Sequence, residues 1–69
     1  MPKLPVISGE ELAKLLISKG YSIRSRKGSH VNLVHGSKLP ITVPLHKELK
    51  RGLLRHILKQ AGIEPEEIK

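Results

Sequence analysis

Hydrophobic residues change their spacing twice along this chain, and that change constrains the fold more than any single motif does. Near the N-terminus, Leu12, Leu15 and Leu16 recur at the spacing of an α-helix. Between Tyr21 and Val43 the apolar residues instead alternate with polar ones, as in β-strands with one buried face. A second helical stripe follows, made of Leu49, Leu53, Leu54, Ile57, Leu58 and Ala61. The pattern predicts a helix, a group of strands and a second helix, in that order.

The first helix has clear boundaries. Ser8 and Glu11 have the spacing of a capping box, in which the Ser8 oxygen accepts the Glu11 amide and the glutamate reaches back to the Ser8 amide. Gly20 favours the left-handed conformation that ends many helices. The sequence therefore predicts a helix over residues 9–19.

Three strands are predicted between the helices. The first runs from Tyr21 to Arg26 and ends at the turn Lys27-Gly28-Ser29. The second is His30–His35, and Gly36-Ser37 turns the chain into the third strand, in which Leu39, Ile41 and Val43 alternate. Because Pro40 and Pro44 have no amide hydrogen for a ladder, we expect the third strand to lie at an edge of the sheet or to pair on one side only at these prolines.

Alternation assigns the residues of the first two strands to two faces. The side chains expected to face the core are Tyr21, Ile23, Ser25, Val31 and Leu33. The side chains expected on the other face are Arg24, Arg26, His30 and Asn32.

The second helix is predicted to end at Gly62, and its polar face holds Lys50, Arg51, Arg55, His56 and Lys59. Gly52 lies inside this pattern at a cost of about 1 kcal/mol relative to Ala. Either the helix starts near Gly52, or the missing side chain lets another group approach closely. The final stretch IEPEEIK either adds one helical turn after Pro65 or frays.

These elements predict an α+β domain of order α-β-β-β-α, with both helices on one face of a three-stranded antiparallel sheet. This is the layout of a double-stranded-RNA-binding domain, and we expect residues 1–69 to form a single domain of this kind. The chain has no Cys, and Tyr21 is its one aromatic residue, so the core must be aliphatic.

Charge points to a polyanionic partner. The chain has 13 Lys and Arg against 6 acidic residues, a formal charge of +7, and three of the six Glu lie in the last six residues. Nucleic acid is the commonest polyanion in a cytosol, although small proteins also carry many lysines simply as solvated surface. No apolar run reaches membrane-spanning length and no leader pattern appears, so we expect a cytoplasmic protein with no membrane partner.

The residue types present exclude several kinds of catalytic site. A metal-dependent nuclease needs clustered carboxylates, yet this chain has no Asp, and its other Glu residues are Glu10, Glu11 and Glu48. His30 and His35 are expected on opposite sides of a strand, and no phosphate-binding glycine loop appears. The sequence therefore predicts no metal and no small-molecule cofactor.

RNA brings its own nucleophile, the 2′-hydroxyl, and its cleavage needs a general base and positive charge around the phosphate. His30 provides such a base, with Arg26, Lys27 and the Gly28-Ser29 turn beside it. On residue types alone, a histidine at a turn is more often only solvated.

Several motifs resemble the HicA family of type II toxins, also known as YcfA-like proteins. The shared elements are Gly20-Tyr21, the turn Gly28-Ser29-His30, the strand end Val43-Pro44-Leu45-His46 and the helix Gly52–Gly62, in that order and spacing. Leu53 departs from the threonine often found after the helix-opening glycine, and the hairpin HGSKLP is short and basic.

The resemblance implies a ribonuclease that degrades mRNA, with a fold like a double-stranded-RNA-binding domain. It implies His30 as the catalytic residue and a HicB-like antitoxin as the protein partner, covering the active site. The residues expected to bind RNA are Arg24, Arg26, Lys27, Gly28, Ser29, Lys50 and Arg55.

Two other functions fit the same sequence. A non-catalytic RNA-binding module would read duplex shape through the same scaffold, using the basic run HKELKRG. A small structural or ribosome-associated protein is supported only by the charge. His46 and His56 are assigned neither to RNA binding nor to structure alone.

Overall fold

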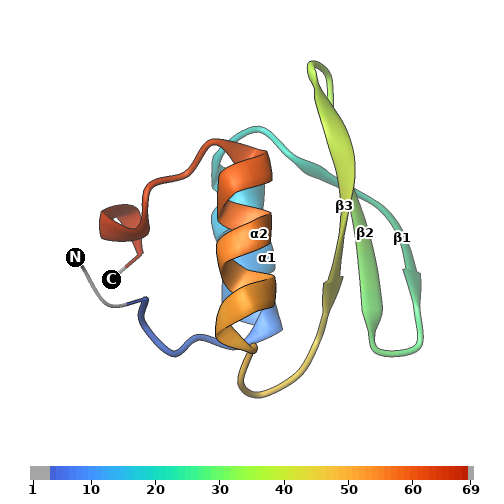
Figure 1. Cartoon of the computed structure of the whole chain (residues 1–69). Helices are drawn as coiled ribbons and strands as arrows, with labels where there is room; N and C mark the ends of the chain where they lie inside the picture. The colour runs from blue at the N-terminus through green and yellow to red at the C-terminus, as the bar shows by residue number, and fades with distance from the viewer. Residues whose placement is uncertain (1–3, 69) are drawn as a thin grey trace.

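The computed structural model describes residues 4–68 and shows two layers, a three-stranded sheet and a pair of helices (Figure 1). Its elements are α1 (Gly9–Ser18), β1 (Ser22–Lys27), β2 (His30–His35), β3 (Lys38–Pro44), α2 (Arg51–Ala61) and the 3₁₀ turn η1 (Pro65–Glu67). The strands are antiparallel in the order β1-β2-β3, and both helices lie on one face of the sheet (Figure 1). The predicted α+β fold is confirmed. Residues 1–3, the start of the stretch searched for a leader, and Lys69, the last residue of the tail, lie outside the described residues.

The start of α1 is fixed by two sets of contacts. The Glu11 amide donates to Ser8 Oγ over 3.1 Å, and the Ser8 amide donates to Glu11 Oε1 over 3.3 Å, so the predicted capping box is confirmed. Gly9 packs against the end of β3, where a Cβ atom would lie 1.9 Å from the Pro44 carbonyl oxygen. The first turn of α1 is therefore seated on the chain that leaves the sheet, which only a glycine at this position allows.

The core between the layers is aliphatic, as expected. Its fully buried side chains are Leu12 and Leu16 of α1, Leu54 and Ile57 of α2, and Leu33 and Val43 of the sheet. Each such burial contributes about 1.5–3 kcal/mol relative to an exposed side chain. Tyr21, the one aromatic residue, is only 3% exposed and joins this core, as predicted.

Strand β1 differs from the expected alternation. Its pairing with β2 shifts between Ile23 and Ser25, which makes Arg24 an extra residue in a bulge. Ser25 therefore lies opposite Asn32, and Arg26 lies opposite Val31, whose side chain is in the core. The predictions that Ser25 faces the core and that Arg26 lies on the open face are wrong, because one extra residue reverses the alternation.

The two edge strands also leave apolar side chains uncovered. Ile23 lies opposite the buried Leu33 but is 55% exposed, so it is not part of the core as predicted. A strand at an edge has a neighbour on one side only, and β1 is such an edge. Strand β3 is the other edge, as its prolines predict, and Leu39 is 70% exposed near a second shift in register.

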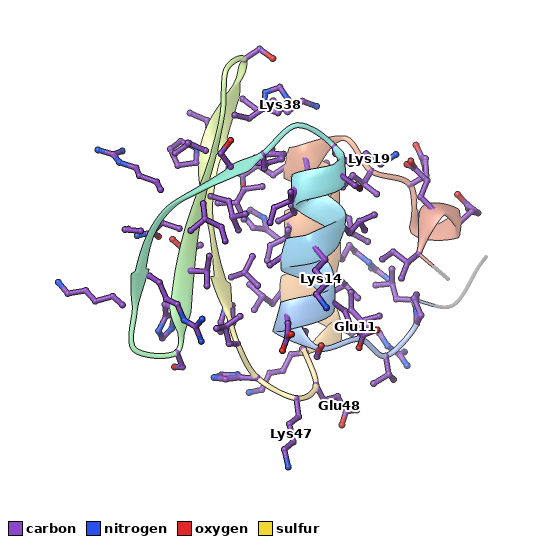
Figure 2. The ribbon with its side chains drawn as sticks, turned by 180° about the vertical axis from the view of Figure 1, so that it is seen from behind. Glu11, Lys14, Lys19, Lys38, Lys47 and Glu48 are labelled. Atoms are coloured by element: carbon purple, nitrogen blue, oxygen red, sulfur yellow. The ribbon has the colours of Figure 1, made fainter. Side chains whose placement is uncertain are left out.

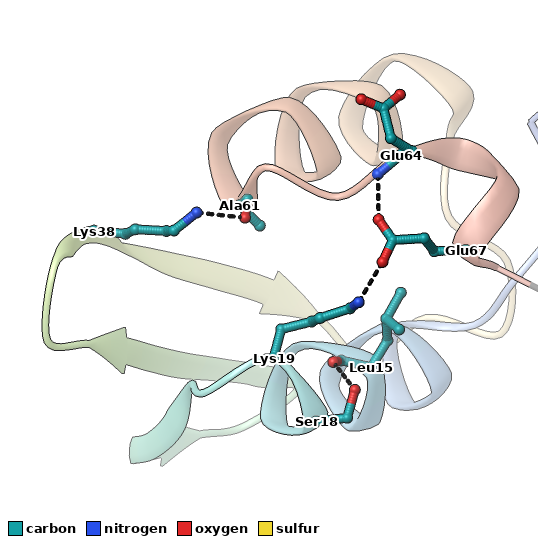
Figure 3. Close-up of polar contacts among 7 residues, drawn as sticks. All are labelled: Leu15, Ser18, Lys19, Lys38, Ala61, Glu64 and Glu67. Carbon is teal, nitrogen blue, oxygen red and sulfur yellow. Dashed lines mark hydrogen bonds and ion pairs between the residues drawn. The ribbon is translucent and has the colours of Figure 1, made fainter.

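Helix α2 starts at Arg51, so the first of the two interpretations of Gly52, a helix start nearby, is confirmed. Gly62 adopts a φ of 72° and ends the helix, as predicted. The side chain of Lys38 donates to the Ala61 carbonyl oxygen over 2.9 Å at this end of the helix (Figure 3). A basic group there complements the negative end of the helix dipole.

The C-terminal tail makes one short 3₁₀ turn after Pro65, which confirms the first of its two predicted conformations. Lys19 forms an ion pair with Glu67, and the Glu64 amide donates to Glu67 Oε2 over 2.7 Å (Figure 3). The tail is thus joined to the end of α1 by a single carboxylate with two partners.

Candidate active site

His30 is the first residue of β2 and follows the two-residue turn Gly28-Ser29 directly. Gly28 has a φ of 59°, a conformation that other residues rarely adopt, so the tight turn depends on this glycine. His30 is exposed and lies opposite Lys27 on β1 and Pro44 on β3. Its neighbour Val31 is buried under the helices, so the His30 side chain belongs to the open face of the sheet.

The turn before His30 is tied to the loop between β3 and α2. The Leu45 amide donates to the Ser29 carbonyl oxygen over 2.6 Å, and the Gly9 amide donates to the His46 carbonyl oxygen over 2.9 Å. Three segments distant in sequence therefore meet at one end of the molecule, where both helices also begin (Figure 1). We call this the hairpin end.

Positive charge gathers at the hairpin end. The cationic residues on its segments are Arg26, Lys27, Lys47, Lys50 and Arg51, and all are exposed. Figure 2 shows Lys47 reaching away from the loop beside Glu48. Within residues 4–68, ion pairs join only Lys14 to Glu10 and Lys19 to Glu67, so none of these five cations forms an ion pair with this part of the chain. The acidic residues at the same end are Glu10, Glu11 and Glu48, which leaves an excess of positive charge. Such a surface attracts polyanions.

The structure gathers some of the predicted RNA-binding residues around His30 and separates others. Lys27, Gly28 and Ser29 adjoin His30, and Lys50 lies at the same end as the N-cap of α2. Arg24 occupies the bulge, and Arg26 lies on the other side of the sheet from His30. Arg55 is one helical turn beyond Arg51, where it lines a groove of about 600 Å³ with Leu58, Ile63 and Pro65.

The other histidines differ from His30 in their surroundings. His35 ends β2, where its Nδ1 accepts the Ser37 amide over 3.0 Å and its ring packs on Tyr21 at a centroid distance of 4.9 Å. Through these contacts, His35 stabilises the turn between β2 and β3. His46 and His56 are exposed on the loop and on α2. Within residues 4–68, no group of three or more His, Cys, Asp or Glu side chains is placed to hold a metal ion.

Two features near His30 were missed by the sequence analysis. Lys47 adds a cation to the hairpin end, and its place directly after His46 in the motif was the available signal. The second feature is a hydrogen-bonded row across the open face, formed by Ser25, Asn32 and Thr42. We call it the polar row. The bulge in β1 brings Ser25 into it, and no local sequence pattern reveals that bulge.

Comparison with known proteins identifies a family. Residues 9–63 match the family model described as the HicA toxin of bacterial toxin-antitoxin. A solved structure titled as a toxin–antitoxin complex from Streptococcus pneumoniae is similar over 83% of this chain and 98% of the other, with 40% sequence identity and a TM-score of 0.71. No curated protein matches. None of the helices described is long and apolar enough to span a membrane.

Fold and site together define a class of protein: a small, basic, two-layer α+β domain with one histidine exposed at a hairpin turn on the open face of its sheet. Within that class, the match over residues 9–63 shows that the chain belongs to the HicA toxin family of toxin–antitoxin systems.

Proposed function

We propose that this HicA family member is an endoribonuclease that cleaves mRNA without a metal ion, with His30 as general acid and base. The observation that carries the proposal is the position of His30. It is exposed on the open sheet face, directly after the Gly28-Ser29 turn and opposite Lys27, at the end of the molecule where the cations form no ion pair with residues 4–68.

The chemistry at this site uses the 2′-hydroxyl of RNA. His30 accepts the proton of that hydroxyl while its oxygen forms a bond to the adjacent phosphorus. The bond from phosphorus to the 5′-oxygen breaks, and the protonated His30 then acts as the acid and gives its proton to that oxygen. The products are a 2′,3′-cyclic phosphate and a free 5′-hydroxyl. Lys27 offsets the negative charge that builds up on the phosphate, and a general base of this kind contributes about 10²–10⁴-fold in rate.

RNA binding is assigned to the free cations and the turn. Lys27, Gly28 and Ser29 would contact the reacting phosphate, and Lys50 would contact a neighbouring one at the same end of the molecule. Arg24 in the bulge and Arg55 on α2 would contact flanking phosphates, as would Arg26, which lies on the other side of the sheet. Each such contact strengthens binding in a way that salt weakens.

The partner proposed for this chain is a HicB-like antitoxin that covers the hairpin end. The similar solved structure is a toxin–antitoxin complex, and the charge of +7 on this chain favours an acidic partner surface. Association rates measured at low and at physiological salt check this, since steering by charge slows as salt rises. The proposed place of action is the cytoplasm, where mRNA is translated.

The test is cleavage of a labelled single-stranded RNA by the purified chain in excess EDTA, with His30→Ala alongside. We expect undiminished cleavage by the parent, ends that carry a cyclic phosphate or its 3′-phosphate derivative, and no cleavage by the variant. Loss of the parent's activity in EDTA, with recovery on adding Mg²⁺, would overturn the mechanism. RNA binding without cleavage would favour the non-catalytic binding module.

A further inference from the structure

The polar row crosses all three strands of the open face. Thr42 Oγ1 donates to Asn32 Oδ1 over 2.6 Å, and Asn32 Nδ2 donates to Ser25 Oγ over 3.0 Å. The register agrees, since Asn32 lies opposite Ser25 on β1 and opposite Thr42 on β3. The three side chains therefore form one continuous hydrogen-bonded line.

This line runs parallel to the row that contains His30. On β2, His30 and Asn32 are two residues apart on the same face, which is about 7 Å along a strand. Lys27 and Pro44 flank His30 in the same way that Ser25 and Thr42 flank Asn32. When the phosphate that is cut lies at His30 and Lys27, the nucleotide next to that phosphate can therefore reach the polar row.

The direction of the hydrogen bonds determines what the row offers to a ligand. Ser25 accepts from Asn32, so its own hydroxyl hydrogen is left to donate. Thr42 donates to Asn32, so its oxygen lone pairs are left to accept. Ser25 and Thr42 are exposed, and their bonds to Asn32 hold these groups in place before any ligand arrives.

The composition of the open face narrows the kind of contact it makes. The polar row is uncharged, although the chain as a whole carries +7. Tyr21 is the only Phe, Trp or Tyr residue in the sequence and is 3% exposed, so the polar row has no such ring beside it for a base to stack on. The side chains of the polar row can instead form hydrogen bonds to the edge of a base, which requires a base that is unpaired and splayed out.

We propose that the polar row is a base-reading subsite for the nucleotide next to the phosphate that is cut, and that the substrate at this position is single-stranded RNA. The subsite rests on the proposed function. Lys27 supplies charge to the phosphate, whereas Ser25 and Thr42 supply a donor and an acceptor to the base edge. The row thereby sets which sites in an RNA are cut.

The test compares Ser25→Ala and Thr42→Val with Ser22→Ala as a matched control. Ser22 is an exposed serine on β1 and lies opposite Val34, outside the polar row. Two measurements are made on each variant. One is the map of cut sites and the kcat and KM on a single-stranded RNA. The other is the affinity for a 2′-O-methyl oligonucleotide of the same sequence, which keeps its base edges but has no nucleophile.

Loss of one hydrogen bond to a base is expected to weaken the affinity about two- to tenfold in Ser25→Ala and Thr42→Val, and not in Ser22→Ala. The cut sites should redistribute and KM should rise, while the pH profile of kcat stays parental because His30 is intact. If Ser25→Ala and Thr42→Val give the same cut sites and affinity as Ser22→Ala, the proposal is overturned. This holds even if their melting temperatures fall, because the polar row would then only stabilise the sheet.

The affinity measurement also separates this proposal from the proposed function. If the parent cuts no RNA, or if His30→Ala cuts at the parental rate, the nuclease mechanism fails. The 2′-O-methyl comparison does not depend on cutting. A selective loss of affinity in the two row variants would then support the subsite alone, and parental affinity would overturn it.

Discussion

The two ends of the molecule use their lysines differently. At the end where the helices stop, Lys19 pairs with Glu67 and Lys38 binds the Ala61 carbonyl oxygen (Figure 3). At the hairpin end, Lys27 and Lys47 are exposed and form no ion pair with the described residues. The first pair of lysines joins parts of the fold, whereas the second pair makes no such contact within residues 4–68 and is the pair that we propose meets a partner. A total charge of +7 therefore combines two kinds of lysine with different roles.

The largest expected effect is at the hairpin end, from His30→Ala. We expect cleavage to fall about 10²–10⁴-fold because a general base is lost. The melting temperature should stay close to that of the parent, since removing an exposed side chain outside the core changes stability by about 0.5 kcal/mol or less. His56→Ala, an exposed histidine on α2, is the matched control for both measurements. Parental cleavage by His30→Ala would leave the hairpin end without a catalytic role.

Gly9→Ala tests a contact at the hairpin end that serves the fold. A methyl group there would meet the Pro44 carbonyl oxygen at 1.9 Å, so the backbone must move, at a cost of about 1–3 kcal/mol. Chemical denaturation measures this loss. Gly52→Ala is the control, because nothing lies within 4 Å of its would-be methyl group, and it should stabilise the protein by up to about 1 kcal/mol. Equal effects in the two variants would contradict the contact.

A smaller effect is expected from replacing one lysine at each end of the molecule with alanine. Lys27→Ala should weaken RNA binding severalfold and reduce its dependence on salt, with an unchanged melting temperature. Lys38→Ala should lower the melting temperature and leave RNA binding and its salt dependence unchanged, because the Lys38 ammonium group binds the end of α2. Salt titrations of binding and thermal melts on both variants give a two-by-two comparison. The contrast between the ends fails if both variants change the same property.

The smallest expected effect is the pH dependence of the tail. The hydrogen bond from Lys19, together with that from the Glu64 amide, holds the pKa of the Glu67 carboxyl below its ordinary value of 4.5. A lowered pKa in the folded state means that Glu67 stabilises the protein above pH 4.5, and that this contribution is lost as the pH falls through the folded-state pKa.

The measurement is the melting temperature of the parent and of Glu67→Gln between pH 7 and pH 3. The parent should melt higher near neutral pH, and the difference should shrink in acid. Glu66→Gln is the control, because the neighbouring Glu66 is also exposed but makes no ion pair with the described residues. A difference that is constant with pH would show that the tail does not depend on the charge of Glu67.

Local signals in the sequence predicted most of the fold. Ser8 and Glu11 determine the start of α1 by contacts within one turn, and Gly62 ends α2 through its own backbone conformation. Both effects act over a few residues, so the sequence states them directly. The bulge at Arg24 depends on how β1 pairs with β2, and one extra residue reversed the predicted faces of Ser25 and Arg26. The spacing of apolar residues along one strand does not determine how that strand pairs with its neighbour.

In the candidate site, too, some features follow from the local sequence and others only from the fold. His30 was found from the turn motif, and Lys27 and Ser29 follow from being its neighbours in sequence. The bond from the Leu45 amide to the Ser29 carbonyl oxygen joins residues 16 positions apart, and the polar row joins three strands. These features arise from the folded arrangement, so only the structure reveals them.

The irregular edges of the sheet have a consequence for the behaviour of the protein at high concentration. A free strand edge is a template on which another molecule can add its own strand, and such additions lead to aggregates. Here β1 carries a bulge and the positively charged Arg24, and β3 carries Pro40 and Pro44. Neither edge presents an unbroken row of amides, so sheets of two molecules are not expected to join. The irregular edges thus limit association by strand addition, while the open face of the sheet stays exposed.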